Sequence, residues 1–110
     1  MITTFRFVEQ AEVELDEAAT YYGAEPSVGL AFTEEIDRVL GLAMRFPRSG
    51  TLVPQKRVRR DIRLFRLNPD FPYDIVATTI DEKDLLLVLA VAHQSRRPKY
   101  WISRLSEAKP

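Results

Sequence analysis

The sequence feature that most constrains the fold is an apolar run of eight residues, Leu85 to Ala92, followed directly by His93, the only histidine of the chain. A run of this length without polar alternation is typical of a β-strand that is buried on both faces. We therefore expect residues 85–92 to form the centre of a sheet. The polar residues from His93 to Arg97 leave the end of this strand, where a rigid element can hold a functional site in place.

The rest of the chain predicts two helices and three further strands around this run. Apolar residues recur at helical spacing from Glu9 to Tyr22, and again from an N-cap at Ser27 to about Phe46. The predicted fold class is α+β: an N-terminal strand, an αα-hairpin, a three-stranded antiparallel meander and a short C-terminal helix, all in one domain spanning residues 1–110. Strand patterns cover residues 3–8, 56–67 and 71–80, with a loop at 51–55, a polar turn at 81–84 and a helical turn or two at 98–105.

The composition excludes several kinds of site. The chain has no cysteine and a single histidine, which excludes disulfides, thiolate metal sites and multi-histidine metal centres. It has no glycine-rich phosphate loop, nucleophile elbow or metal-ligand spacing, so we expect neither a metal nor a cofactor. No signal peptide is recognisable at the N-terminus, and the longest apolar run is too short to span a bilayer. We therefore expect a cytoplasmic protein without a membrane partner.

The net charge is zero, but the charges are distributed unevenly along the chain. Residues 1–46 hold three basic and nine acidic residues, a balance of −6, whereas residues 47–110 hold thirteen basic and seven acidic residues, a balance of +6. Such polarity is typical of a protein whose basic half binds an acidic or polyanionic partner. Acidic helices that simply face solvent would give the same pattern, so the charge balance leaves both interpretations open.

Arginines are concentrated between residues 56 and 66. On a strand they would present a row of guanidinium groups, which suits the recognition of phosphates or carboxylates. The alternative is a solvated sheet face whose charges discourage edge pairing. We favour binding, because these arginines alternate with core residues on a rigid element. The arginines of this segment are Arg57, Arg59, Arg60, Arg63 and Arg66.

His93 is a candidate acid or base, because histidine is the side chain that titrates near neutral pH without perturbation. It shares strand parity with Val91, so it equally fits a residue at the edge of the core. Tyr73, Tyr100 and Trp101 can stack on bases, although single aromatic residues near strand and helix ends usually anchor the core. The identity of any catalytic residues therefore stays open, and the candidates are His93, Arg59, Arg60 and Tyr73.

Five segments form a recognisable series in their order and spacing: Glu14–Tyr22, Gly29–Ile36, Val58–Arg60, Phe71–Tyr73 and Val88–Trp101. This series resembles the RelE/ParE superfamily, the small toxins of bacterial type II toxin–antitoxin modules that are often named plasmid stabilisation proteins. The resemblance implies a helical hairpin packed on an antiparallel-rich sheet. It also implies a toxin held in a hetero-oligomeric complex by a small antitoxin that covers its active surface. We expect the target or the antitoxin to bind at Arg57, Arg59, Arg60, Arg63, Arg96, Arg97, Tyr100 and Trp101.

The superfamily divides by target. RelE-like members are ribosome-dependent endonucleases that cleave mRNA, whereas ParE-like members share the fold, lack the recognised nuclease residues and act on DNA gyrase. The neutral net charge favours a ParE-like toxin, as does the pair Gln94-Ser95 after His93, where nuclease members tend to carry an acid–base residue. The alternatives are an mRNA endonuclease that uses His93 and the arginines, which would make the chain an enzyme, and an inactive relative that only binds the antitoxin.

Overall fold

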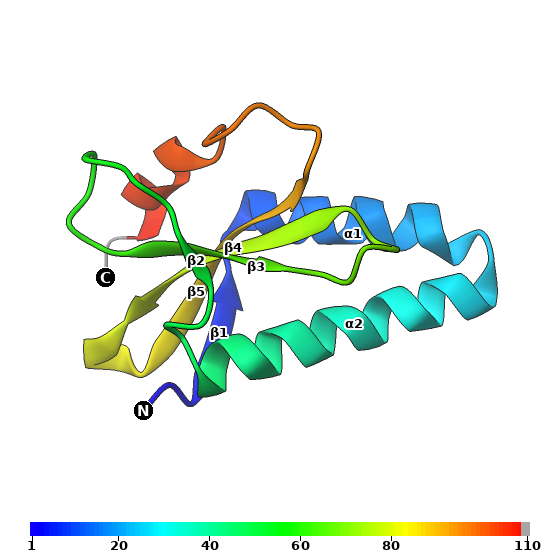
Figure 1. Cartoon of the computed structure of the whole chain (residues 1–110), viewed down its shortest axis with the longest axis horizontal. Coiled ribbons are helices and arrows are strands. Elements are labelled where there is room, and N and C mark those ends of the chain that lie inside the picture. Colours follow the sequence, from blue (N-terminus) through cyan, green and yellow to red (C-terminus); the bar gives the residue numbers. More distant parts are fainter. Residues whose placement is uncertain (109–110) are drawn as a thin grey trace.

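The computed structural model describes residues 1–108 of the 110-residue chain. Two long helices form a hairpin that packs against a twisted sheet, and a short helical segment closes the C-terminal end (Figure 1). Along the chain the elements are β1 (Thr4–Phe7), α1 (Glu9–Gly23), α2 (Pro26–Arg45), β2 (Thr51–Leu52), β3 (Ile62–Arg66), β4 (Tyr73–Ile80), the 3-10 helix η1 (Asp81–Lys83), β5 (Leu85–His93) and the 3-10 helix η2 (Ile102–Ala108).

The five strands lie in the order β1-β5-β4-β3-β2. Every neighbouring pair is antiparallel except β1 and β5, which run parallel. The predicted α+β class, with a helical hairpin and an antiparallel-rich sheet, is confirmed, and β3, β4 and β5 form the predicted meander. The structure adds β2, an edge strand that the sequence did not indicate, so the sheet has one strand more than expected.

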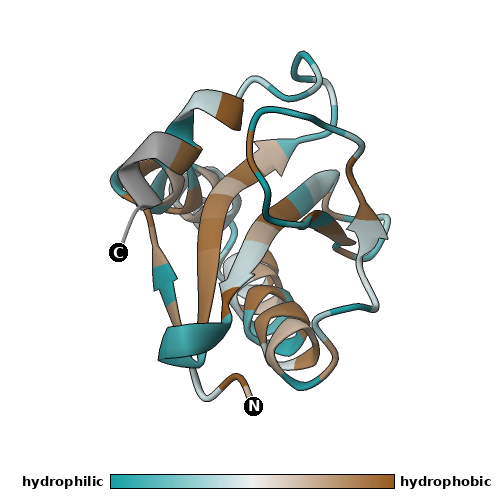
Figure 2. Ribbon diagram, turned by 90° about the vertical axis from the view of Figure 1, so that its left-hand side faces the viewer, coloured by the Kyte–Doolittle hydropathy of each residue, from teal (hydrophilic) through white to brown (hydrophobic). Residues whose placement is uncertain are grey.

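β5 is the buried strand that the apolar run predicts. Each residue from Leu85 to Ala92 is at most 8% exposed, and Figure 2 shows this long strand brown along its length. The structure corrects its position in the sheet, since β4 is the middle strand and β5 lies between β4 and β1. β1 pairs only with the first part of β5, from Leu85 to Val88. The second part of this edge is therefore left without a strand partner.

Different parts of the chain cover the two faces of the sheet. Tyr73 points toward the helices, where its ring lies 6.2 Å from that of Tyr22 and 6.0 Å from that of Phe32. The next residue, Asp74, points to the opposite face, because successive side chains of a strand alternate. There it lines a hollow together with Trp101 of the C-terminal segment. Because other parts of the chain cover both faces of the sheet, the sequence of β5 does not alternate between apolar and polar residues.

α2 packs on the sheet through the apolar stripe that its sequence predicts. At the centre of this contact, the ring of Phe32 lies 4.9 Å from Tyr22, 5.3 Å from Phe71 and 6.0 Å from Tyr73. This aromatic cluster joins both helices to the β3–β4 hairpin. The buried members of the α2 stripe are Phe32, Ile36, Val39, Leu40 and Ala43.

The start of α2 differs from the prediction. Glu25 is the N-cap residue and Pro26 takes the first helical position, where its missing N–H leaves no hydrogen bond unmade. Ser27 lies inside the helix, with its hydroxyl 3.5 Å from the carboxylate of Glu25. Only Ala24 and Glu25 therefore separate the two helices, fewer than the four residues expected.

The largest difference from the prediction lies between residues 51 and 67. The expected strand over 56–67 is confirmed only in its second half, because β3 covers Ile62–Arg66 and residues 56–61 are irregular. The expected loop at 51–55 instead contributes Thr51–Leu52 to the sheet edge, paired with Leu64 and Arg63. Smaller shifts affect β4, which begins at Tyr73, and the closing helical segment, which covers Ile102–Ala108.

A buried carboxylate fastens the tip of the β3–β4 hairpin to α2. Glu35 is 8% exposed and accepts two hydrogen bonds from the guanidinium of Arg38, at 2.8 and 2.7 Å. It also accepts the backbone N–H of Asn68 at 2.8 Å. These three donors compensate for the burial of the charge. They hold the pKa of Glu35 below its usual value, chiefly through the hydrogen bonds from Arg38.

We expect Glu35→Gln to lower the free energy of unfolding by about 1–2 kcal/mol at neutral pH. Because the folded-state pKa lies below the ordinary value of 4.5, the stabilisation is complete above that value and is lost as the pH falls through the folded pKa. Urea unfolding from neutral pH down to about pH 3 should show a difference between the two proteins that shrinks in acid. The exposed neighbour variant Glu34→Gln should behave like the wild type. A difference that persists unchanged in acid would contradict this role of the charge.

Candidate functional site

The basic segment 56–61 is held in a compact loop by one side chain, that of Gln55. Its Oε1 accepts the backbone N–H groups of Arg57 and Val58 at 2.9 and 3.1 Å. Its Nε2 donates to the carbonyl oxygens of Val58 and Arg60 at 3.2 and 3.1 Å. Gln55 thus supplies hydrogen bonds that a neighbouring strand would otherwise provide. The arginines are therefore presented on a loop and not in a row along a strand.

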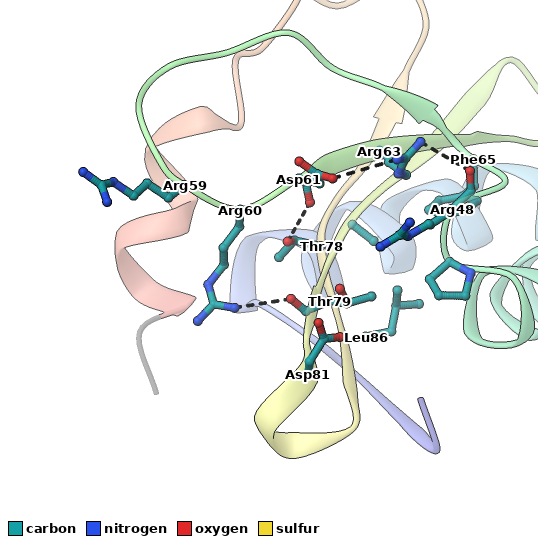
Figure 3. Close-up of a pocket in the computed structure, with 12 residues that line it drawn as sticks. Arg48, Arg59, Arg60, Asp61, Arg63, Phe65, Thr78, Thr79, Asp81 and Leu86 are labelled. Atoms are coloured by element: carbon teal, nitrogen blue, oxygen red, sulfur yellow. Dashed lines mark hydrogen bonds and ion pairs between the residues drawn. The ribbon is translucent and has the colours of Figure 1, made fainter. Parts of the chain in front are cut away.

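Four arginines, Arg48, Arg59, Arg60 and Arg63, line a cleft of about 400 Å³ between this loop and the β4–β5 turn; we call it the arginine cleft. Figure 3 shows Arg48 and Arg60 on opposite sides of the cleft, whereas Arg59 extends away from it. The cleft brings together three of the five arginines that the sequence singled out. It also contains Arg48, which the sequence analysis did not select.

The other two arginines of the predicted row lie elsewhere. Arg57 is exposed on the loop outside the cleft. Arg66 forms an ion pair at 3.1 Å with the buried carboxylate of Asp74, which also accepts a hydrogen bond from Gln94 at 3.2 Å. The expectation of a single guanidinium row on one strand face is therefore wrong.

His93 lies at the end of β5 beside Tyr73, its partner in β4. The two rings meet edge to face, with their centroids 5.0 Å apart. Nδ1 of His93 accepts the backbone N–H of Ser95 at 3.1 Å and lies 2.7 Å from the Ser95 hydroxyl. His93 and Tyr73 line a hollow of about 250 Å³ together with Tyr21 and Arg96.

The candidate catalytic residues are not assembled at one site. Arg60 contacts β4 at Thr79, with Nη1 3.4 Å from the carbonyl oxygen, whereas His93 and Tyr73 lie at the other end of that strand. The extended chain between Tyr73 and Thr79 spans about 20 Å at roughly 3.3 Å per residue. Groups that transfer protons to one substrate must lie within hydrogen-bond reach of it. The two groups of candidates therefore cannot act on the same reacting atoms.

Side chains close the part of the β5 edge that β1 leaves open. β1 ends opposite Val88, so the carbonyl of Leu89 and the N–H of Val91 have no strand partner on that side. Glu14 of α1 accepts the Val91 N–H at 3.1 Å, and Arg104 donates to the Leu89 carbonyl at 3.0 Å. Arg104 also pairs with Glu14 at 2.8 Å. This ion pair takes the place of a further strand.

Tyr100 takes part in the same network around Glu14, whereas its neighbour Trp101 packs elsewhere. The Tyr100 hydroxyl donates to Glu14 at 2.6 Å, and the guanidinium of Arg96 lies 3.9 Å from the centre of its ring. Burial, and then the hydrogen bond to Glu14, raise the pKa of Tyr100 well above its ordinary value, so the phenol is a neutral donor. Trp101 is 3% exposed and packs in the core. A role of Trp101 in binding a partner stays a prediction, although little of its side chain is exposed.

The structure shows a helical hairpin, an antiparallel-rich sheet and a basic surface, and the sequence matches a family of known proteins. Residues 5–98 match the family model described as the ParE toxin of the type II toxin–antitoxin system parDE. This chain belongs to the ParE toxin family. The resemblance to the RelE/ParE superfamily is thus confirmed, on its ParE side. A search of curated proteins finds no significant match to this ParE-family toxin.

The fold of this ParE-family toxin is similar to that of a chain in a solved structure. That structure is described as the chromosomal ParDE TA system from P. aeruginosa. The alignment covers 84% of this chain and 96% of that chain, with a TM-score of 0.62 and 15% sequence identity. At this identity the likeness concerns the arrangement of helices and strands.

Two residues of this ParE-family toxin were missed as site residues because their roles depend on distant partners. Arg48 carries no local signal, and it reaches the cleft only because β2 pairs with β3. Glu14 lies in one of the recognised segments, but its partners Val91 and Arg104 are in the last third of the sequence. Within residues 1–108, no helix is long and apolar enough to cross a membrane, and no group of three or more histidine, aspartate or glutamate side chains could hold a metal ion.

Proposed function

We propose that this ParE-family toxin arrests bacterial growth by binding DNA gyrase, and that a cognate antitoxin neutralises it in a hetero-oligomeric cytoplasmic complex. Membership of the family carries this proposal, because the matched model describes the toxin of a parDE module. We propose further that residues 1–110 act as one toxin domain, since the match extends over residues 5–98.

The positions of the candidate catalytic residues support binding over catalysis. Cleavage of RNA beside a 2′-hydroxyl requires a base, an acid and cations around one phosphate. In this chain the arginine cleft lies about 20 Å along β4 from His93. The Nδ1 atom of His93 is already engaged by Ser95. These features favour a toxin that acts by occupying a protein target.

Two exposed arginines are available to an acidic antitoxin. The side chains of Arg57 and Arg97 make no hydrogen bond or ion pair with the part of the chain that the structure describes. An acidic side chain can therefore pair with either of them without displacing another partner. The balance of −6 over residues 1–46 would repel the same antitoxin segment and direct it toward the basic half of the chain.

One hollow supports a second candidate, the mRNA endonuclease. His93, Tyr73 and Arg96 line it together, which combines an imidazole, a phenol and a cation within one surface depression. Burial raises the pKa of Tyr73, so its phenol would donate a proton rather than accept one. If cleavage occurs, these residues are where it should be sought.

Induction of the toxin gene in a bacterial host should stop growth, and coexpression of the adjacent antitoxin gene should restore it. Purified toxin should inhibit supercoiling by DNA gyrase and should leave mRNA intact in a translating ribosome extract. Growth that continues when the toxin is induced without the antitoxin would contradict the toxin proposal. Cleavage of mRNA with unchanged gyrase activity would replace the gyrase target by the endonuclease.

The variant His93→Ala separates the two mechanisms within cells. We expect it to arrest growth as the wild type does, because gyrase binding does not require an acid or base. An endonuclease that used His93 would lose roughly 100-fold or more of its cleavage rate. Thermal unfolding of the variant provides the control for folding. Loss of growth arrest in a folded His93→Ala protein would favour the endonuclease.

A further inference from the structure

The arginine cleft carries an excess of positive charge. Its acidic side chains, Asp61 and Asp81, are fewer than its arginines. The ion pairs formed by these arginines are long and exposed. Arg63 lies 3.9 Å from Asp61, whose side chain is 77% exposed, and Arg60 lies 3.4 Å from Glu82, whose side chain is 62% exposed. Such pairs contribute little to stability, so an incoming anion can replace them.

Backbone oxygens fix the directions of two of these arginines. Arg63 donates to the carbonyl of Gly50 at 2.9 Å and to that of Arg48 at 3.3 Å. Arg60 donates to the carbonyl of Thr79 at 3.4 Å. A guanidinium has five N–H donors, so each arginine keeps donors for a ligand. Side chains that are already positioned lose less conformational entropy when the ligand binds.

A glycine allows the wall that carries Arg48 to approach the sheet. A Cβ atom at Gly50 would lie 2.7 Å from the ring of Phe65 and 2.8 Å from the carbonyl oxygen of Leu64. Atoms this close cannot be accommodated without a shift, so the position needs the absence of a side chain. The close packing at Gly50 keeps Arg48 opposite Arg60 across the cleft.

The floor of the cleft is apolar, in contrast to its walls. Phe65, Ala77 and Leu86 line the floor and are at most 7% exposed. Beside them, the hydroxyl of Thr79 makes no hydrogen bond to the described part of the chain and is free to donate. Cationic walls over an apolar floor fit a ligand with an anionic end and a flat apolar body.

We propose that the arginine cleft binds a phosphoryl group, carried by a free nucleotide or by single-stranded nucleic acid. Arginines that converge from two sides match the several oxygens of a phosphoryl group. The volume of about 400 Å³ lies within the range of small-ligand pockets, roughly 300–1,000 Å³. The site does not depend on gyrase or on the antitoxin, so it can be tested with the toxin alone.

The test is a titration of the full-length, isotopically labelled toxin, followed through its backbone amide NMR signals. The probes are inorganic phosphate, adenosine 5′-monophosphate, a single-stranded oligonucleotide and hexaglutamate. We expect the phosphate-bearing probes to shift the amide signals of Phe65 and Thr79. Tighter binding of the mononucleotide than of phosphate assigns a free nucleotide, and tighter binding of the oligonucleotide with a steep salt dependence assigns nucleic acid.

The variant Arg48→Gln provides the decisive comparison. Arg48 is exposed, and its side chain makes no hydrogen bond or ion pair with the described residues, so its loss should not affect folding. We expect this variant to weaken mononucleotide binding about tenfold. Arg45→Gln makes the same charge change outside the cleft and should bind as the wild type does.

Three results would overturn the proposal. The first is the absence of shifts at Phe65 and Thr79 both with millimolar mononucleotide and with the oligonucleotide. The second is unchanged affinity in Arg48→Gln. The third is tighter binding of hexaglutamate than of every phosphate-bearing probe, which would assign the cleft to an acidic peptide. None of these results concerns growth arrest, which tests the toxin proposal separately.

Discussion

Glu14→Ala is expected to lower the free energy of unfolding by about 3 kcal/mol. Glu14 and Arg104 are each only 13% exposed in their side chains, and Glu14 accepts hydrogen bonds from Arg104, from Tyr100 and from the backbone of Val91. Removing the carboxylate takes a shared acceptor away from the Tyr100 hydroxyl and the Val91 N–H in a partly buried site, and it takes the acidic partner away from Arg104, which keeps its hydrogen bond to the Leu89 carbonyl. That penalty exceeds the cost of losing one surface ion pair.

Denaturant unfolding followed by circular dichroism measures this loss. Glu17→Ala on the same helix is the matched control, because Glu17 is exposed and lies outside the network. The double variant Glu14→Leu, Arg104→Met should recover much of the stability, because it removes both charges together. A loss below about 1 kcal/mol in Glu14→Ala would show that the edge of β5 does not need this ion pair.

Phe32→Ala is expected to lower the free energy of unfolding by about 3–5 kcal/mol, as much as Glu14→Ala or more. Phe32 is completely buried, and its ring contacts Tyr22, Phe71 and Tyr73. Truncation removes the contact that joins the helical hairpin to the sheet and leaves a cavity that these rigid rings cannot fill. For a chain of 110 residues such a loss is a large part of the total stability, roughly 0.05–0.15 kcal/mol per residue.

The comparison for this prediction is Phe46→Ala. Phe46 follows α2 and is 54% exposed, so the same substitution there should cost less than about 1 kcal/mol. Thermal and urea unfolding of both variants measures the contrast. Equal losses in the two variants would mean that the aromatic cluster does not hold the two layers together.

The elements with strong local signals were predictable from the sequence. The apolar run gave β5, and the stripes of α1 and α2 gave the helical hairpin, because burial imposes a period on each of them. The segment 56–61 was not predictable in the same way. Its alternation of Val58 with arginines imitates a strand, but the side chain of Gln55 satisfies its backbone locally. Side-chain hydrogen bonds of this kind leave no periodic trace in a sequence.

The candidate sites were less predictable than the fold, because they join distant segments. The sequence singled out the arginines and placed them in one row, whereas three of them share a cleft and Arg66 pairs with Asp74. It placed His93 at the end of β5, where the structure finds it, but not its contacts with Ser95 and Tyr73. Which residues meet depends on strand order, and strand order is a property of the whole chain.

The parallel pairing of β1 with β5 also determines when the toxin can fold. Thr4 pairs with Leu85, so the first strand must wait for a partner that is translated 81 residues later. At roughly 5–20 residues per second, ribosomal synthesis imposes a delay of about 4–16 s. During this interval the helices leave the ribosome with their apolar stripes uncovered. The sheet is therefore completed only when nearly the whole chain has been made, and folding ends in one late step.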